Sequence, residues 1–355
     1  MGRVHNSHWI LPIVRSPTLC VFGLLVTFVH AQAQSIEYQE HVRFSHYSPV
    51  ATTKELFERM ETPLWIQRTA EGLTAQKQEL PEYSVNLPSE QFVLYVPQTA
   101  PPGGYGLVVF IPPWPDAKLP AEWRSGLDRA GTIFVSAAKS GNDQEPILRR
   151  VALALHAYEN VRTAYSINPE RVYISGFSGG ARVALHVAIG YPDIFRGALI
   201  DGGGDPLGSE IVPYPAIKML HRAQEHLRLI YTYGAQDEFN ASQARRSAGS
   251  ARDACISDVM VFEMRSHGHE HADAATWDRA LSRLDAPANS EPSDRLSACR
   301  TRFESNLASA VAQARDVVLH ADVAKGRGAV EDLNSRYAQL AETDVLALWK
   351  QLSSH

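Results

Sequence analysis

The sequence predicts an α/β protein with a mostly parallel sheet, helices on both faces and a helical C-terminal appendage. Short β-branched and apolar runs recur between Pro and Gly residues, and several are continuously hydrophobic, as strands covered on both faces should be. Helical patterns lie between these runs, and such alternation favours a parallel sheet. The predicted strands are Phe92–Val96, Leu107–Ile111, Thr132–Ser136, Val172–Ser175, Ala198–Ile200, Leu229–Tyr233 and Val259–Met264.

Helices are predicted where apolar residues recur at helical spacing. A segment that begins and ends with proline, Pro287–Pro292 ("PANSEP"), has no such pattern and indicates a linker before the tail. In the tail, Gly326 and Gly328 are expected to mark a turn between helices. The predicted helices are Thr53–Arg68, Ile147–Ala164, Ala181–Ile189 and Asp273–Leu284, with further helices within Asp294–His355.

Composition narrows the possible functions. The 355 residues are 45% hydrophobic and carry a net charge of −5. This length is sufficient for one large core and an appendage. The mild acidity and the scattered charges give no indication of a nucleic acid or an anionic membrane as a partner.

The N-terminus is typical of an export signal. Arg3 and Arg15 precede the apolar run Leu19–Val29, and Ala31-Gln32-Ala33 fits a small-x-small cleavage site. The apolar run is short for a bilayer span, although an uncleaved anchor is the alternative. We therefore expect a signal peptide over residues 1–33 and a periplasmic or secreted mature protein without a stable membrane span.

Cysteine usage agrees with export. Cys20 lies within the apolar run and would leave with the signal, so the mature chain keeps two cysteines, Cys255 and Cys299. An even number of cysteines in an exported protein favours a disulfide, and two buried free thiols are the alternative. We predict that Cys255 and Cys299 are joined.

One segment has the pattern of a nucleophile elbow. Gly176-Phe177-Ser178-Gly179-Gly180 matches G-x-S-x-G, between the predicted strand "RVYIS" and the predicted helix "ARVALHVAI". Glycines on both sides permit a strained turn that exposes the hydroxyl of Ser178 at the carboxyl edge of the sheet. The sequence therefore predicts Ser178 as a nucleophile.

A serine hydroxyl needs a base, and the base needs an orienting acid. Asp237 follows the strand at Leu229–Tyr233, with Glu238 as the neighbouring alternative. The next strand leads to the loop His267-Gly268-His269-Glu270-His271. His269 is the predicted base, ahead of His267 and then His271. Because both loops follow later strands of the sheet, they are expected at the same edge as Ser178.

Three segments resemble a known family. "NPERVYISGFSGGARVALHVAIGYPDIFRGALIDGG", "YTYGAQDEFN" and "HGHEHADAATWDRAL" are similar to secreted esterases of the α/β-hydrolase superfamily, close to the polyhydroxybutyrate depolymerase and feruloyl esterase-like group. The resemblance covers roughly residues 92–285. It implies Ser178, Asp237 and His269 as the catalytic residues, a small or polymeric ester as substrate, and no cofactor. Residues 34–286 would form the catalytic domain and 287–355 a helical extension.

The oxyanion hole departs from that family. Its first donor should be the backbone N–H of Gly179, next after the nucleophile. Many relatives have His-Gly-Gly after the strand at Leu107–Ile111, where this chain has Pro112-Pro113-Trp114-Pro115, and proline has no N–H. The second donor must then come from Trp114, by its backbone or indole N–H, or from the backbone of Asp116.

Other interpretations remain open at this level. His267, His269 and His271 alternate and could hold zinc, although no fourth ligand is evident. The proline-rich segment would suit a hydrolase-like binding protein without turnover, and a serine peptidase would use the same three residues. Trp114, Trp123 and Phe177 could line an acyl pocket, although aromatic residues are more often part of a core.

Overall fold

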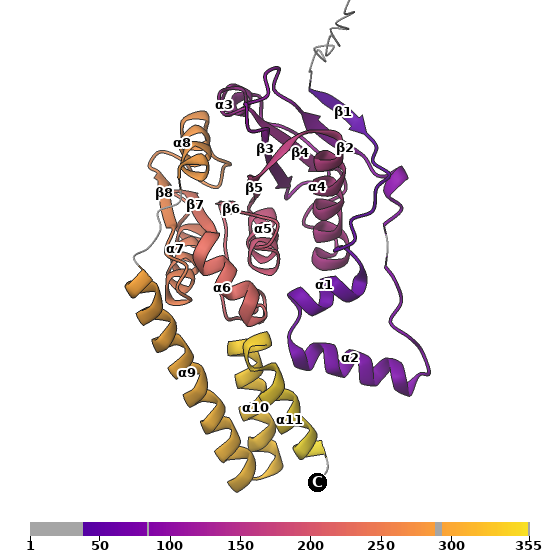
Figure 1. The fold of residues 1–355 in the computed structure, drawn as a ribbon, viewed down its shortest axis with the longest axis vertical. Coiled ribbons are helices and arrows are strands. Elements are labelled where there is room, and N and C mark those ends of the chain that lie inside the picture. Colours follow the sequence, from indigo (N-terminus) through magenta and orange to yellow (C-terminus); the bar gives the residue numbers. More distant parts are fainter. Residues whose placement is uncertain (1–37, 84, 288–292, 354–355) are drawn as a thin grey trace, which may run out of the picture. The chain divides into compact units, whose positions relative to one another are not determined.

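An eight-stranded sheet organises the computed structural model, which describes residues 38–83, 85–287 and 293–353. The strand order is β1-β2-β4-β3-β5-β6-β7-β8, with β2 antiparallel to both of its neighbours and every other pair parallel (Figure 1). The strands are β1 (Gln39–Val42), β2 (Phe92–Tyr95), β3 (Tyr105–Ile111), β4 (Thr132–Ala137), β5 (Ile167–Phe177), β6 (Gly197–Asp201), β7 (Arg228–Gly234) and β8 (Val259–Met264).

Both faces of the central strands are buried, which explains their continuous hydrophobic runs. Along β3, Leu107 and Val109 join one hydrophobic cluster, while Val108 and Phe110 join a second cluster on the opposite face. All seven predicted strands are present. The edge strand β1 was not predicted, because its sequence, Gln-Glu-His-Val, has no apolar pattern and it is held mainly by backbone pairing with β2.

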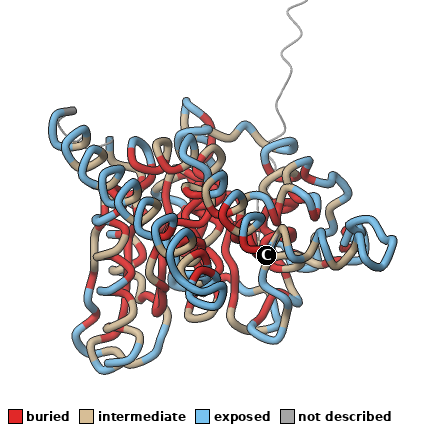
Figure 2. The backbone as a smooth tube through the Cα atoms, turned by 90° about the horizontal axis from the view of Figure 1, so that it is seen from below, coloured by how far each residue is buried: buried red, intermediate tan, exposed pale blue. Residues whose placement is uncertain are grey.

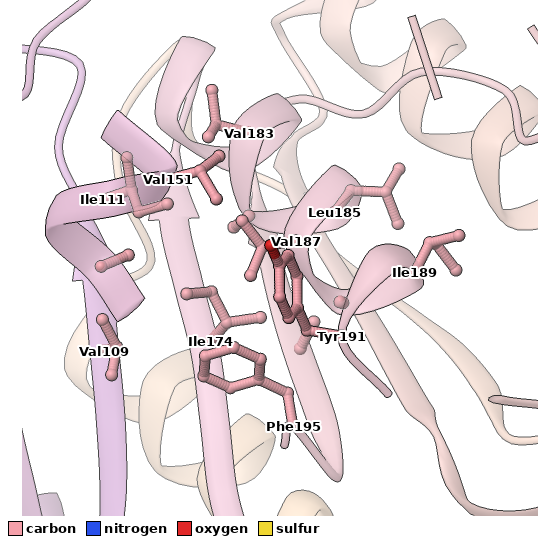
Figure 3. Packing of buried hydrophobic residues seen from close by; sticks show 14 of the residues in the cluster. Val109, Ile111, Val151, Ile174, Val183, Leu185, Val187, Ile189, Tyr191 and Phe195 are labelled. Atoms are coloured by element: carbon pink, nitrogen blue, oxygen red, sulfur yellow. The ribbon is translucent and has the colours of Figure 1, made fainter. Parts of the chain in front are cut away.

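Helices cover the two faces unequally. Side chains of α3 (Arg124–Ala130) and α8 (Ala274–Asp285) belong to the cluster on one face. The cluster on the other face contains side chains from five helices, and Figure 3 shows part of this packing around Ile174 and Val187. These helices are α1 (Thr53–Met60), α4 (Ala152–Ala164), α5 (Gly179–Gly190), α6 (Ile217–His226) and α7 (Glu238–Asp253). The predicted α/β class with helices on both faces is confirmed.

Two predicted helices are interrupted. The helix predicted over 53–68 divides into α1 and α2 (Pro63–Ala75), because Thr62 caps a new helix and Pro63 occupies its first position. The helix predicted from Ile147 begins with one π-helical stretch, Pro146–Val151, before α4. Glu145 caps this stretch by accepting the backbone N–H groups of Ile147 and Arg149.

The C-terminal region is helical, as predicted. It comprises α9 (Ser293–His320), α10 (Val323–Tyr337) and α11 (Glu342–Ser353), and α10 contacts both of the others. These helices share a small hydrophobic cluster with Leu64 of α2. Figure 2 shows buried segments in red at the interior of the chain, with exposed segments around them. Within the residues that the structure describes, no helix has the length and hydrophobicity needed to cross a membrane.

The turn predicted at Gly326 and Gly328 is wrong. Both glycines lie inside α10, and the chain turns instead near Asp322, which caps that helix. A Cβ on Gly326 would lie 2.7 Å from Cδ2 of Leu352, so glycine allows α10 to approach α11 closely. The predicted signal peptide over residues 1–33 and most of the "PANSEP" linker lie outside the described residues.

Cys255 and Cys299 form a disulfide, with their Cα atoms 5.8 Å apart. It links the end of α7 to α9, so the helical extension is attached covalently beside the strand that leads to the histidine loop. The predicted pairing is therefore confirmed.

Replacing both cysteines by alanine is expected to lower the free energy of unfolding by about 2–4 kcal/mol, because the cross-link closes a long loop and restricts the unfolded chain. The bridged cysteines are 44 residues apart. In urea unfolding, the midpoint of the wild-type protein should fall when reductant is added. The double variant should not respond to reductant, and equal midpoints for both proteins without reductant would contradict the prediction.

Candidate active site

Ser178 occupies the sharp turn between β5 and α5. Its φ of 55° is a conformation that non-glycine residues rarely adopt. Glycines make the turn possible, since a Cβ on Gly180 would lie 2.0 Å from the backbone oxygen of Ile111. The backbone N–H of Ser178 donates to the carbonyl of Asp201 on the adjacent β6, over 2.8 Å. The strained turn is therefore held by neighbouring strands.

Asp237 lies at the first turn after β7, where it caps α7. Its carboxylate accepts the backbone N–H of Asn240 at 3.2 Å and the Asn240 side chain at 2.8 Å. Burial would raise the pKa of Asp237, but these bonds and the contact with His269 outweigh it and hold the pKa below its usual value. Asp237 is thus ionised at neutral pH. Its neighbour Glu238 is exposed.

His269 connects the acid to the serine. Its Nδ1 lies 2.6 Å from Oδ2 of Asp237, and its Nε2 lies 2.8 Å from Oγ of Ser178. An ionised carboxylate can only accept, so Nδ1 carries the proton and Nε2 presents a lone pair to the serine hydroxyl. This is the tautomer that a base for Ser178 requires.

The other two histidines have different partners. Nε2 of His267 lies 3.6 Å from Asp273, and Nε2 of His271 lies 3.8 Å from Glu122. The three imidazoles therefore do not converge as a zinc site would need. Among the described residues, no group of three or more His, Cys, Asp or Glu side chains is arranged to hold a metal ion.

Backbone contacts bring the acid and histidine loops together. The N–H of Gln236 donates to the carbonyl of His267 at 3.0 Å. The histidine loop also passes directly over Gly234, where a Cβ would lie 2.0 Å from the carbonyl oxygen of Gly268. Because β7 and β8 are parallel neighbours, their carboxyl ends deliver both loops to one edge, as the sequence predicted.

Asp201 was missed as a site residue by the sequence analysis. It ends β6 and is only 1% exposed, yet its carboxylate accepts the Thr232 hydroxyl at 2.6 Å and the Ala272 N–H at 2.7 Å. Burial raises its pKa to about 6. Asp201 therefore supports Ser178 through its backbone and the end of the histidine loop through its side chain. A carboxylate directly after a hydrophobic strand, in "LIDGG", was the available signal.

Asp201→Ala is expected to destabilise the fold by about 1–3 kcal/mol, because the Ala272 N–H and the Thr232 hydroxyl would lose a buried acceptor. Loosening of the histidine loop should also lower kcat. Asp201→Asn should retain most of the stability, since its carbonyl can accept from Ala272 and its amide can donate to Thr232. Thermal unfolding and kcat of both variants test this, and equal behaviour of the two would contradict it.

The predicted oxyanion residues lie beside the elbow. Gly179 is the first residue of α5, so its N–H has no partner within the helix. The Trp114 ring lies 6.0 Å from the Phe177 ring, and its Nε1 is buried without a hydrogen-bond partner among the described residues. Asn142, which the sequence analysis did not single out as a donor, packs against Gly179 with its amide end: a Cβ there would lie 2.2 Å from its Oδ1 and 2.9 Å from its Nδ2.

A cavity of about 540 Å³ opens beside Gly179. None of Trp114, Trp123 and Phe177 lines it, so the acyl-pocket role considered for these three aromatic residues is not supported by this cavity. Trp123 is fully buried and stacks on Trp277 with ring centroids 3.8 Å apart. The Phe177 ring packs against the imidazole of His269, with the ring centroids 5.0 Å apart.

Comparisons with known proteins give esterases and related hydrolases. A 46-residue segment is 44% identical to poly(3-hydroxyalkanoate) depolymerase C of Paucimonas lemoignei, covering 13% of this chain and 11% of that protein. A 110-residue segment is 30% identical to the probable carboxylesterase SOBER1-like of Arabidopsis thaliana, covering 30% of this chain and 40% of that protein. The chain thus spans less than half the length of these relatives. No family model matches it.

Similar solved structures include esterases and peptidases. One is a puromycin-hydrolyzing peptidase of Mycobacterium tuberculosis, with 18% identity, a TM-score of 0.43 and coverage of 57% of this chain and 38% of that one. Strand order and the serine turn after β5 are those of an α/β hydrolase. The chain therefore has an α/β-hydrolase fold.

Proposed function

We propose that the protein is a serine hydrolase that cleaves carboxylic esters by acyl transfer to water. One observation carries this proposal: Oγ of Ser178, His269 and the Asp237 carboxylate form a continuous hydrogen-bonded chain, with contacts of 2.8 and 2.6 Å. The lowered pKa of Asp237 keeps this carboxylate ionised, as its proposed role needs. The esterase relatives support the substrate class.

In this proposal Nε2 of His269 takes the proton of Ser178 as Oγ attacks the ester carbonyl. Asp237 keeps the proton on Nδ1 and stabilises the imidazolium that forms. The imidazolium then protonates the departing alcohol, which leaves an acyl group on Ser178. A water molecule, deprotonated by His269, attacks the acyl carbon, and the returned proton restores the serine.

The negative charge on the tetrahedral intermediate needs at least two donors. Gly179 supplies a backbone N–H at the N-terminus of α5, where the helix dipole adds to the attraction. For the second donor we propose Trp114, whose buried Nε1 has no acceptor among the described residues. The Asn142 amide beside Gly179 is the other candidate donor.

The reaction class is tested with a matched pair of substrates, p-nitrophenyl acetate and the p-nitroanilide of acetic acid. We expect the ester to be hydrolysed with a much higher kcat/KM, and a fluorophosphonate to label Ser178. Comparable turnover of the anilide would support a peptidase of the same fold. Folded protein that neither cleaves the substrates nor reacts with the phosphonate would contradict catalysis and support a binding protein.

We further propose that the protein acts outside the cytoplasm, in the periplasm or after secretion. The sequence of residues 1–33 supports export, and the Cys255–Cys299 disulfide suits an oxidising compartment. Fractionation of cells that express the full chain, with N-terminal sequencing of the mature protein, tests this proposal.

A further inference from the structure

The cavity beside Gly179 extends along α5. Its floor is formed by Gly179, Arg182, Val183 and His186, which share one face of that helix at helical spacing. With a rise of 1.5 Å per residue, Gly179 and His186 are about 10 Å apart along the helix axis. One arm of an ester bound at Ser178 can therefore run along α5 toward His186.

The two arginines of the cavity already have acceptors within the protein. Arg182 forms an ion pair with Asp205. Arg150 is buried and donates to the carbonyls of Ser140 and Pro112, each at 2.9 Å. Arg182 is thus paired with a carboxylate, whereas Arg150 is held by backbone carbonyls. The lining holds four carboxylates, Glu61, Glu145, Asp205 and Glu210, against these two guanidinium groups. The aliphatic part of the lining comes from Met60, Ile147, Val183 and Ile211.

The end of the cavity near His186 offers acceptors. Nε2 of His186 contacts the Met60 carbonyl at 3.0 Å and must donate, and burial lowers the His186 pKa to about 4, so Nδ1 is an unprotonated acceptor. Glu61 follows Met60 and is half-buried. The Glu61 carboxylate forms no hydrogen bond or ion pair with the described residues. Glu145 and Glu210 also line the cavity, and neither forms an ion pair with a described residue.

We infer that this cavity selects esters in which one aliphatic arm ends in a protonated amine, and that Glu61 binds this amine. The inference rests on the proposed function. A half-buried carboxylate without a partner is unfavourable, and an ammonium group supplies both the missing charge and charge-assisted hydrogen bonds. A hydroxyl would supply a donor without the charge, and a methyl group neither.

The selectivity should depend on pH. Burial, with a smaller effect of Glu145, raises the pKa of Glu61 to about 7, so Glu61 is largely ionised at pH 8 and largely neutral at pH 6. An aliphatic amine stays protonated across this range. The attraction is therefore present at pH 8 and weakens as the pH falls through 7. The charged and titratable groups that line this cavity with Glu61 are Glu145, Arg150, Arg182, His186, Asp205 and Glu210. Arg68, which pairs with Glu331, lines a neighbouring cavity with Glu61.

The test uses two pairs of esters. In the first pair, p-nitrophenyl 6-aminohexanoate and p-nitrophenyl hexanoate, the amine is on the acyl arm. In the second pair, the acetate esters of 6-aminohexanol and hexanol, it is on the alcohol arm. At pH 8 we expect the amino ester of one pair to have a kcat/KM at least about ten-fold higher, the effect of one charge-assisted hydrogen bond. The ratio within a pair cancels the pH dependence of the catalytic step that both esters share, and it should shrink at pH 6.

Glu61→Gln should remove most of the amine preference and leave hexanoate hydrolysis within about two-fold, because only the charge is lost. Glu58→Gln is the matched control: Glu58 lies in α1, three residues before Glu61, pairs with Lys54 and does not line the cavity. It should keep the preference. Melting temperatures of the variants check that each is folded.

Binding to Ser178→Ala separates this inference from the proposed function. Calorimetric titration with hexylamine and hexanol measures recognition of the arm without turnover, and Glu61→Gln in the same background should abolish any difference. If the protein binds the amine through Glu61 but does not hydrolyse acetate esters, the proposed reaction is contradicted and the amine site is retained. Acetate hydrolysis without an amine preference in either pair, or a preference that Glu61→Gln preserves, would overturn this inference.

Discussion

Ser178→Ala is expected to lower kcat for p-nitrophenyl acetate by about 10⁴- to 10⁶-fold, because the nucleophile and its base act as a unit. Loss of Oγ leaves His269 with no hydroxyl to deprotonate, and covalent acyl transfer is no longer possible. The residual rate would come from the oxyanion donors and substrate binding alone. Steady-state kinetics on purified protein measures the effect.

The fold should survive this change. Alanine can occupy the strained turn as serine does, and the backbone bond from residue 178 to Asp201 is unaffected. The melting temperature should therefore stay close to that of the wild type. A variant that is folded and retains more than about a tenth of the wild-type kcat would refute Ser178 as the nucleophile.

His269→Ala is expected to lower kcat by a similar factor, and His267→Ala and His271→Ala by less than about ten-fold. The reason is geometric: His269 contacts both Ser178 and Asp237, whereas the other imidazoles contact Asp273 and Glu122. The two neighbouring variants are the matched controls. If His267→Ala were inactive and His269→Ala active, the assigned base would be wrong.

The pH dependence of kcat/KM should show the same base. Hydrogen bonds hold the pKa of Asp237 below its usual value, so this carboxylate stays ionised above about pH 4 and contributes no change in neutral solution. Activity should therefore rise with pH over the range in which histidine loses its proton, about pH 5 to 8. Activity that does not change over this range would contradict a histidine base.

Several parts of the site could be read from the sequence because their signals are local. A glycine-flanked serine between a strand and a helix specifies its own turn, and Ser178 adopts it. Asp237 and His269 each follow a hydrophobic strand, and parallel strands deliver the loops after them to one edge. The two remaining cysteines left one pairing, and the structure forms it.

Other parts depended on long-range packing. The sequence favoured His269 over His267 only by its place in the loop. In the structure, the imidazole of His269 is the one that contacts both Ser178 and Asp237. The Asp201 carboxylate accepts the backbone N–H of Ala272, which is 71 residues away in the sequence. The periodicity of hydrophobic residues cannot predict a contact between such distant residues. Gly326 reads as a turn in sequence, yet it lies within α10, where the Leu352 side chain of α11 packs against it.

The sequence by itself determined the alternation of strands and helices and the loops that carry Ser178, Asp237 and His269, because periodicity and turn chemistry act between neighbours in the chain. Only the tertiary structure decided what lies around the serine. The cavity combines Glu61, which follows α1, with Glu145 and Arg182, and its charge balance depends on the pairing of Arg182 with Asp205 instead of with either glutamate. Such pairings are set by packing between segments far apart in sequence, where burial and distance control the electrostatic energy.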